Sequence, residues 1–346
     1  MAPPGAGLGR FRRVAAFFHR HPVLLLLGFT PGIPEYLSGS TAVWPLVLAP
    51  GGFFLFLGLN LALYGPGVLL LREAWVRRGR SWAALLLYGT AYALLEEGTA
   101  LSTLFNPHAS VVGTLGSYGR FGGVNLVWTI GVVGVHVLYS VGIPILLLGL
   151  ALPETRGRSM LTHRQIVLAV LVYGADITLL SLSTSARWSF EPAWVVGAVI
   201  LAALLWLVAW QLPSGTLEPP RERPTYGPRV FFLAGLAVFP LLIVIPGVGE
   251  AAHAPALVAG VVQLLVAALL FVAVRRTIGR RSNEPQLIAL ALGATLPLVA
   301  SGLLSQLFFP LVLGIDVVYA LFFYAIWQKY RPEPTPAGPP AAVLAA

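Results

Sequence analysis

Apolar runs of about 20 residues, each long enough to cross a bilayer as an α-helix, recur along the whole of this 346-residue chain. Hydrophobic residues make up 57% of the sequence and charged residues only 10%. A soluble domain of this size does not have that composition. The sequence therefore predicts an all-α, polytopic transmembrane helix bundle.

The positions of the apolar runs predict ten membrane spans. With spans of about 20 residues, we expect helices near 23–48, 53–72, 81–104, 124–150, 165–186, 192–212, 230–248, 255–275, 285–304 and 308–328. The first span contains Pro31 and Pro34, which interrupt a helix. Broken helices at membrane depth occur only where protein or water satisfies the freed backbone groups, so we expect Glu35 beside a cavity. The alternative is a short surface helix, with Glu35 at the interface.

Basic residues predict the orientation of the bundle. If both termini are cytoplasmic, 20 of the 22 Lys and Arg residues fall on the cytoplasmic side, and only Arg120 and Arg187 fall outside. Cytoplasmic loops carry an excess of basic residues, and one span more or fewer would invert every later loop. The net charge of +9 comes from short clusters between the spans. It therefore reflects topology, and no nucleic-acid partner is expected.

These patterns divide the chain into five segments. They are a basic cytoplasmic segment (1–22), a transmembrane half of six spans (23–212), a cytoplasmic loop (213–229), a transmembrane half of four spans (230–328) and a disordered tail (329–346). The preference for arginine over lysine indicates a GC-rich prokaryotic genome. We therefore expect a multi-pass protein of the plasma (inner) membrane, with the lipid bilayer as its immediate partner. Cysteine is absent, which excludes disulfides and thiolate chemistry.

Two adjacent acids, Glu96 and Glu97, lie inside the third predicted span and are the best pointer to function. An acid at the centre of a membrane helix costs roughly 2.5–3.5 kcal/mol on insertion. Such residues usually mark a substrate path, a proton relay or a catalytic site. Helical spacing places further polar residues of the first half on faces that can line one cavity. The resulting set is Glu35, Asn60, Tyr92, Glu96, Glu97, His136, Ser140 and Asp176.

The chemistry of this set suggests an acid–base site. We expect one glutamate to carry a proton at neutral pH and the other to act as a base toward water. His136 would donate to a developing oxyanion or orient the base, or it is simply a buried imidazole bonded to Tyr139 or Ser140. The outside loop 106–123 is either a lid, with Arg120 folded over the acids, or a plain connector.

The pair Glu96-Glu97 in one helix, followed by His136 in the middle of the next, resembles the CAAX protease and bacteriocin-processing (CPBP) family of glutamic intramembrane proteases. The resemblance covers residues 81–185. It implies that Glu96 or Glu97 activates water, with His136 as its partner, to hydrolyse a membrane peptide. That family carries Glu-Glu-x-x-x-Arg, Phe-x-x-x-His and His-x-x-x-Asn or Asp. This chain has Leu101 in place of the arginine and Val132 in place of the phenylalanine. No His-x-x-x-Asn or Asp follows on the fifth helix, where only Asp176 is available.

The same residues also suit other functions. Proton- or ion-coupled transporters of small molecules use midplane acids, broken helices and many spans, although the two halves of this chain do not repeat each other. A non-catalytic membrane assembly subunit is a third interpretation, in which the acids pair with a partner or with Arg120 or Arg187. No cofactor is expected. The carboxylates and His136 leave a divalent metal open, although no diagnostic ligand spacing occurs.

Overall fold

The structure, a computed structural model, describes residue 13 and residues 16–40, 50–188, 191–281, 283–305 and 310–330. Within these ranges the chain is predominantly helical, as predicted. The α-helices are α2 (Pro22–Pro31), α4 (Pro50–Arg77), α5 (Trp82–Ala93), α6 (Leu126–Val135), α7 (Ile143–Ala151), α8 (His163–Arg187), α9 (Pro192–Gln211), α10 (Pro228–Phe239), α11 (Ile245–Ala251), α12 (Ala256–Thr277), α13 (Glu284–Ser305) and α14 (Pro310–Tyr330). Four π-helical segments continue some of them: η1 (Gly32–Leu37), η2 (Leu94–Ala100), η4 (His136–Gly142) and η6 (Pro240–Val244).

Six helical segments in the described part of the chain are long and apolar enough to cross a membrane. They are Leu126–Ala151, His163–Arg187, Pro192–Gln211, Pro228–Ala251, Ala256–Thr277 and Glu284–Leu304. Each of the ten predicted spans overlaps a helical segment, but the described part of the first, Pro22–Leu37, is shorter than a full crossing. Its continuation over residues 41–49 lies outside the described residues, as do most of the predicted segment 1–22 and residues 331–346 of the predicted tail.

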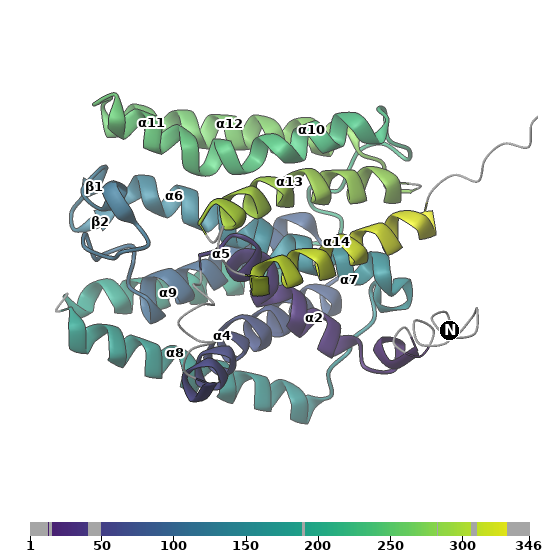
Figure 1. Cartoon of the computed structure of the whole chain (residues 1–346), viewed down its shortest axis with the longest axis horizontal. Helices are drawn as coiled ribbons and strands as arrows, with labels where there is room; N and C mark the ends of the chain where they lie inside the picture. The colour runs from purple at the N-terminus through teal and green to yellow at the C-terminus, as the bar shows by residue number, and fades with distance from the viewer. Residues whose placement is uncertain are drawn as a thin grey trace, which may run out of the picture.

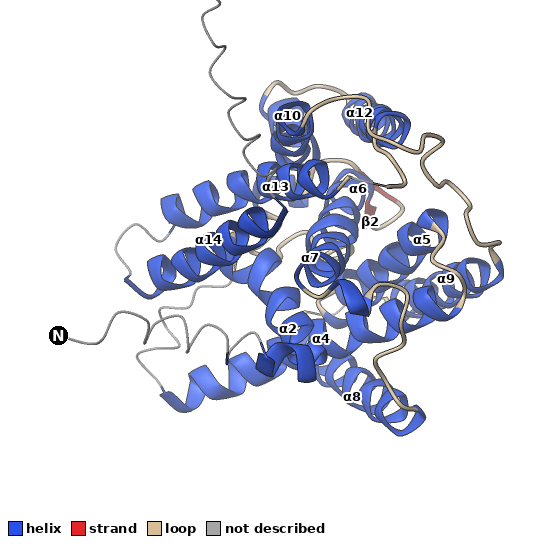
Figure 2. Ribbon diagram, turned by 90° about the vertical axis from the view of Figure 1, so that its right-hand side faces the viewer, coloured by secondary structure: helices blue, strands red, loops and turns tan. Residues whose placement is uncertain are grey.

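The helices run side by side along the long axis of the molecule (Figure 1). Viewed along that axis, the segment α6–η4–α7 runs through the middle (Figure 2). It contacts α5 and α12 through α6, and α2 and α13 through α7. Side chains in the middle of this segment are therefore enclosed on several sides, which places His136 and Ser140 in the interior.

At one end of the bundle, two charged residues of α4 hold the loop between α7 and α8. Arg72 and Glu73 are each only 2% exposed, and Arg72 Nη1 donates to Glu73 Oε1 at 3.0 Å. Arg72 Nη2 also donates to the Thr155 carbonyl at 2.6 Å. The Glu73 carboxylate accepts from the Ser159 hydroxyl at 2.5 Å and from the Met160 amide at 2.8 Å. The ion pair is thus buried together with the backbone that it fixes.

The segment between α9 and α10 is bound to the turn that follows α12. The Thr225 amide donates to the Thr277 carbonyl at 2.7 Å, and the Arg280 amide donates to the Arg221 carbonyl at 3.0 Å. The predicted loop 213–229 is therefore attached to the second half of the chain. The division of the chain at this loop stays a prediction.

Helices α10 and α13 approach most closely at two glycines, Gly235 and Gly293. A Cβ at Gly293 would lie 2.1 Å from the Phe232 carbonyl oxygen. Since overpacking costs about 1–3 kcal/mol, we expect Gly293→Ala to lower the unfolding temperature in detergent measurably. Gly247→Ala is the control, because no atom lies within 4 Å of a Cβ there. Equal unfolding temperatures for the two variants would contradict this packing.

Candidate functional site

Three π-helical segments carry the acids and the histidine predicted from the sequence. Glu35 lies on η1, Glu96 and Glu97 on η2, and His136 on η4. In a π-helix each N–H bonds five residues back, as the Leu101 amide does to the Glu96 carbonyl at 2.9 Å. The wider turn brings the adjacent side chains of Glu96 and Glu97 toward one side. Both can therefore face His136, and such segments occur frequently at functional sites.

His136 lies between the two glutamates. Its Nε2 is 2.9 Å from Glu97 Oε1, and its Nδ1 is 3.3 Å from Glu96 Oε2. Nδ1 is also 2.9 Å from the Ser140 hydroxyl. Tyr139, the other neighbour considered for His136, donates instead to the Ala294 carbonyl at 3.1 Å. The two glutamates, His136 and Ser140 thus form one contiguous cluster.

The two glutamates differ in their hydrogen bonds. Both oxygens of Glu97 are engaged, because its Oε2 accepts from the Thr103 hydroxyl while its Oε1 faces His136. Trp128 Nε1 in turn donates to Thr103 Oγ1 at 3.1 Å. Glu96 is completely buried, and its oxygens form no hydrogen bond of good geometry in the described part of the chain, although the hydroxyls of Tyr64 and Tyr92 are close enough to interact with its carboxyl. Glu97 is therefore fixed through both of its oxygens, whereas Glu96 is not.

Aromatic rings enclose the cluster on its other sides. The ring centroids of Tyr64 and Tyr92 lie 6.3 Å and 6.0 Å from that of His136. The Tyr64 hydroxyl donates to Glu35 Oε1 at 2.5 Å. Glu35 is also within electrostatic range of His136. The structure thus brings Glu35 into the cluster through Tyr64, a residue absent from the predicted set although it lies one turn after Asn60.

Asp176 and Asn60 occupy the periphery. Asp176 on α8 is 5% exposed, and neither of its carboxylate oxygens has a hydrogen-bond partner among the described residues. Tyr173, one turn before it, stacks on Tyr92 with ring centroids 6.2 Å apart and an interplanar angle of 11°. Asn60 on α4 is 9% exposed. Asp176 is therefore linked to the glutamates by two tyrosines rather than by direct contact.

Arg120 does not fold over the acids. Its guanidinium donates to the backbone carbonyls of Phe105, Gly116 and Gly123, which take up its donors. It lies in a two-stranded hairpin of β1 (Arg120–Phe121) and β2 (Val124–Asn125). Gly122 and Gly123 turn this hairpin with φ of +55° and +91°, a conformation that suits glycine.

The loop 106–123 is thus folded rather than a plain connector. It contains a 3-10 turn, η3 (Gly113–Gly116), in addition to the start of the hairpin. Asn125, at the end of the hairpin, caps α6 by accepting from the Trp128 amide at 2.9 Å. The side chain that covers the acids is Thr103, just ahead of this loop. The available signal for it was helical spacing, because Thr99 follows Glu96 by three residues and Thr103 follows Thr99 by four.

Among the described residues, His136 is the only basic side chain that forms an ion pair with Glu96 or Glu97. Arg120 and Arg187, which are also among the described residues, form no such pair. No group of three or more His, Cys, Asp and Glu side chains in the described ranges is arranged to hold a metal ion.

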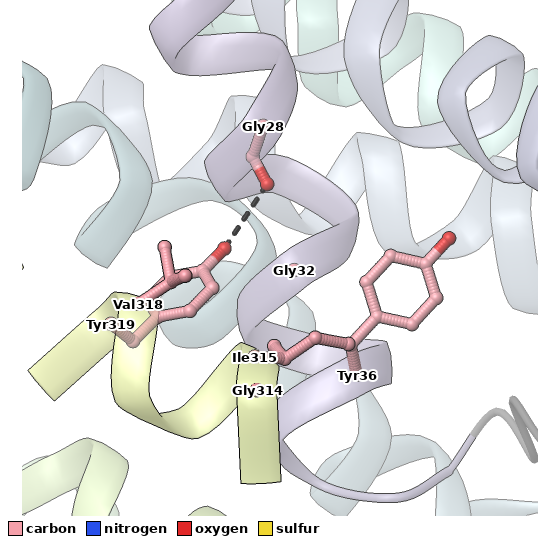
Figure 3. Close-up of a pocket in the computed structure, with 7 residues that line it drawn as sticks. All are labelled: Gly28, Gly32, Tyr36, Gly314, Ile315, Val318 and Tyr319. Carbon is pink, nitrogen blue, oxygen red and sulfur yellow. Dashed lines mark hydrogen bonds between the residues drawn. The ribbon is translucent and has the colours of Figure 1, made fainter. Parts of the chain in front are cut away.

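A separate pocket of about 360 Å³ lies between the α2–η1 segment and α14 (Figure 3). The Tyr319 hydroxyl closes part of it by donating to the Gly28 carbonyl at 3.1 Å. The residues that line it are Gly28, Gly32, Tyr36, Gly314, Ile315, Val318 and Tyr319. None of them belongs to the glutamate cluster, so the pocket and the cluster are distinct features.

Comparison with known proteins identifies the family of the chain. The model of an "Uncharacterized membrane protein family" matches residues 24–346. No curated protein and no solved structure matches the chain significantly. The chain therefore belongs to this uncharacterized membrane protein family and is a membrane protein, as the sequence predicted. The matching family is not the CPBP family, so the resemblance to CPBP proteases rests on the motif residues alone.

Proposed function

We propose that this member of the uncharacterized membrane protein family is an intramembrane hydrolase in which Glu96 activates water to cleave an amide bond of a membrane peptide. The observation that carries the proposal is the asymmetry of the acid pair. Glu97 is held on both oxygens by His136 and Thr103, whereas Glu96 lies 3.3 Å from His136, beside the Tyr64 and Tyr92 hydroxyls, with no hydrogen bond of good geometry to the described residues. A carboxylate placed in this way is suited to take a proton from water.

The reaction uses three groups of the cluster. Glu96 takes one proton from a water molecule as the water oxygen bonds to the peptide carbonyl carbon, and the carbonyl oxygen becomes an oxyanion. His136 carries a proton on both ring nitrogens in this step, so that Nε2 donates to Glu97 while Nδ1, which faces the Ser140 hydroxyl at 2.9 Å in the structure, donates to that oxyanion. The carbon–nitrogen bond then breaks, and the leaving amine takes the proton that Glu96 holds. One product therefore carries a new carboxyl group with an oxygen from solvent.

The resemblance to CPBP proteases supports a glutamate base with a histidine partner, without distinguishing Glu96 from Glu97. In both, two adjacent glutamates precede a histidine on the next helix, here Glu96, Glu97 and His136. The missing arginine and phenylalanine, at Leu101 and Val132, imply that any related chemistry uses other supporting groups. Thr103 and Trp128 take such a place here, because Thr103 donates to Glu97 and Trp128 donates to Thr103.

We infer the topology of ten spans with both termini in the cytoplasm of a plasma membrane from contacts at the two ends of the bundle. Segments predicted to be cytoplasmic contact one another, namely His19 with Glu154, Arg78 with Trp210, and Arg156 with Glu284. Segments predicted to lie outside do the same, namely Tyr118 with Ala254 and His108 with Trp188. The start of α2 and the end of α14 lie at one end of the bundle, and β1 and β2 at the other (Figure 1).

Access to Glu96 requires movement, because its side chain is 0% exposed. We expect the segment between η2 and α6 to move and expose Glu96. It carries Thr103 against Glu97, and its return to the helix is fixed by the Asn125 amide, which donates to the Leu104 carbonyl at 2.9 Å. Release of this segment would open the outer side of the cluster to a peptide.

A proton- or ion-coupled transporter is the second candidate, and one observation favours it. Glu35, on the π-helical continuation of α2, is bonded by Tyr64, whose ring centroid lies 6.3 Å from that of His136, so acids from two different spans join one cluster. Carriers place intramembrane acids on interrupted helices in this way.

Reconstitution separates the two candidates. Purified full-length protein in liposomes is supplied with membrane peptides, and the products are analysed by mass spectrometry while proton flux is recorded with a trapped dye. The hydrolase predicts fragments with new carboxyl and amino ends. If no peptide is cut while proton flux depends on Glu96, the hydrolase proposal is wrong and the transporter is favoured.

A further inference from the structure

Six polar side chains around Glu96 have hydrogen-bonding atoms without a partner in the described part of the chain. Each of the six is no more than 9% exposed. They are Tyr92, Glu96, Thr99, Ser102, Tyr173 and Asp176. A buried polar group without a partner costs about 1–3 kcal/mol, and native proteins keep few of them. So many such groups in one neighbourhood indicate a shared partner.

Packing connects four of these groups into a line. Tyr92 and Tyr173 stack on each other beside the bare backbone of Gly67 on α4, where a Cβ would lie 2.7 Å and 2.8 Å from their Cε2 atoms. Tyr173 lies one turn before Asp176 on α8, so these two side chains share a helix face. Polar atoms therefore extend from Glu96 past the two tyrosines to Asp176, between α5, η2 and α8.

The hydrogen-bond donors and acceptors along this line indicate which molecule can bind there. Carboxylates accept hydrogen bonds, and tyrosine hydroxyls both donate and accept, so the partner must do both. It must also be small, since each of these side chains is almost wholly buried. Water meets both requirements, because a buried water makes two to four hydrogen bonds to otherwise unsatisfied groups.

We propose that a line of ordered water molecules lies between Glu96 and Asp176, held by the hydroxyls of Tyr92 and Tyr173, and supplies water to Glu96 inside the membrane. The presence of water between Glu96 and Asp176 is inferred from the unpartnered polar groups alone. That this water supplies a reaction at Glu96 rests on the proposed hydrolase function. Asp176 then acts as the polar anchor of the line at the end away from His136.

Hydroxyl-radical footprinting of the full chain in lipid nanodiscs tests the hydration. Radicals formed from water by a synchrotron beam oxidise side chains next to bound water even when these are buried, and mass spectrometry measures the rate at each tyrosine. Tyr92 and Tyr173 should be labelled several-fold faster than Tyr139. Tyr139 is the matched control, because it is 0% exposed and its hydroxyl is already bonded to the Ala294 carbonyl.

The variant Asp176→Leu removes the polar anchor. Labelling of Tyr173 should then fall toward the rate of Tyr139, while the exposed Tyr226 keeps its rate. If Tyr92 and Tyr173 of the wild-type protein are labelled as slowly as Tyr139, the proposal is wrong, whatever the labelling of the variant. Labelling needs no cleavage, so labelled tyrosines in a protein that cuts no peptide would refute the hydrolase and leave the water line standing.

Discussion

Glu96→Gln is expected to abolish the cleavage of membrane peptides, whereas Glu97→Gln should leave a reduced but measurable rate. A glutamine at position 96 cannot take a proton from water, and loss of a general base costs roughly 10²–10⁴-fold in rate. A glutamine at position 97 still offers an amide oxygen to His136 Nε2, now 2.9 Å from Glu97 Oε1. Initial rates of peptide cleavage in liposomes measure both effects.

Asp316→Asn is the matched control for this pair. Asp316 is an acid of α14 whose carboxylate oxygens are buried without hydrogen-bond partners among the described residues, and it lies outside the cluster. The same change from acid to amide there should leave cleavage at the wild-type rate. Retained activity in Glu96→Gln together with inactivity in Glu97→Gln would reverse the roles assigned to the two glutamates.

Glu73→Gln should cause a much larger loss of stability than any surface charge change in this chain. The carboxylate is buried with Arg72 and accepts from Ser159 and the Met160 amide. Breaking a buried ion pair leaves the remaining charge without compensation and costs about 3–5 kcal/mol. Reversible unfolding in mixed detergent micelles measures the change in free energy of unfolding.

Glu154→Gln provides the comparison for Glu73→Gln. The pair of Glu154 with His19 has side chains that are 45% and 52% exposed. Exposed pairs contribute about 0–1 kcal/mol, because solvent screens them. Similar losses for the two variants would show that burial of the Arg72–Glu73 pair does not decide its contribution.

The helices could be predicted from the sequence because length and apolarity decide them. Runs of about 20 apolar residues cannot remain extended in a bilayer, since every backbone group must bond within its own segment. The approach of His136 to Glu96 and Glu97 was also predictable, because the polar faces of neighbouring spans must avoid lipid. The count of ten crossings and their orientation stay predictions that rest on the basic residues.

The different contacts of Glu96 and Glu97 could not be predicted, because they depend on π-helical turns. Proline indicates such turns in two places. Pro34 lies within η1, and Pro144, just after η4, lacks an N–H and crowds the carbonyl four residues earlier. Segment η2 contains no proline, and no local pattern announces its wider turn. The sequence therefore did not indicate which way the adjacent side chains of Glu96 and Glu97 point.

Long-range hydrogen bonds account for the remaining differences. Arg120 over the acids was one of two interpretations of the loop, but the carbonyls of Phe105, Gly116 and Gly123 accept from its guanidinium. Thr103 and Tyr64 reach Glu97 and Glu35 only after the chain has folded. Neither contact follows from helical spacing alone.

Cleavage in water labelled with heavy oxygen tests the central claim most directly. If Glu96 activates water, each cut should place one solvent oxygen in the new carboxyl end of the peptide, and Glu96→Gln should remove this labelled product while Asp316→Asn retains it. An absence of labelled product from the wild-type protein, or equal labelling by wild type and Glu96→Gln, would contradict the account.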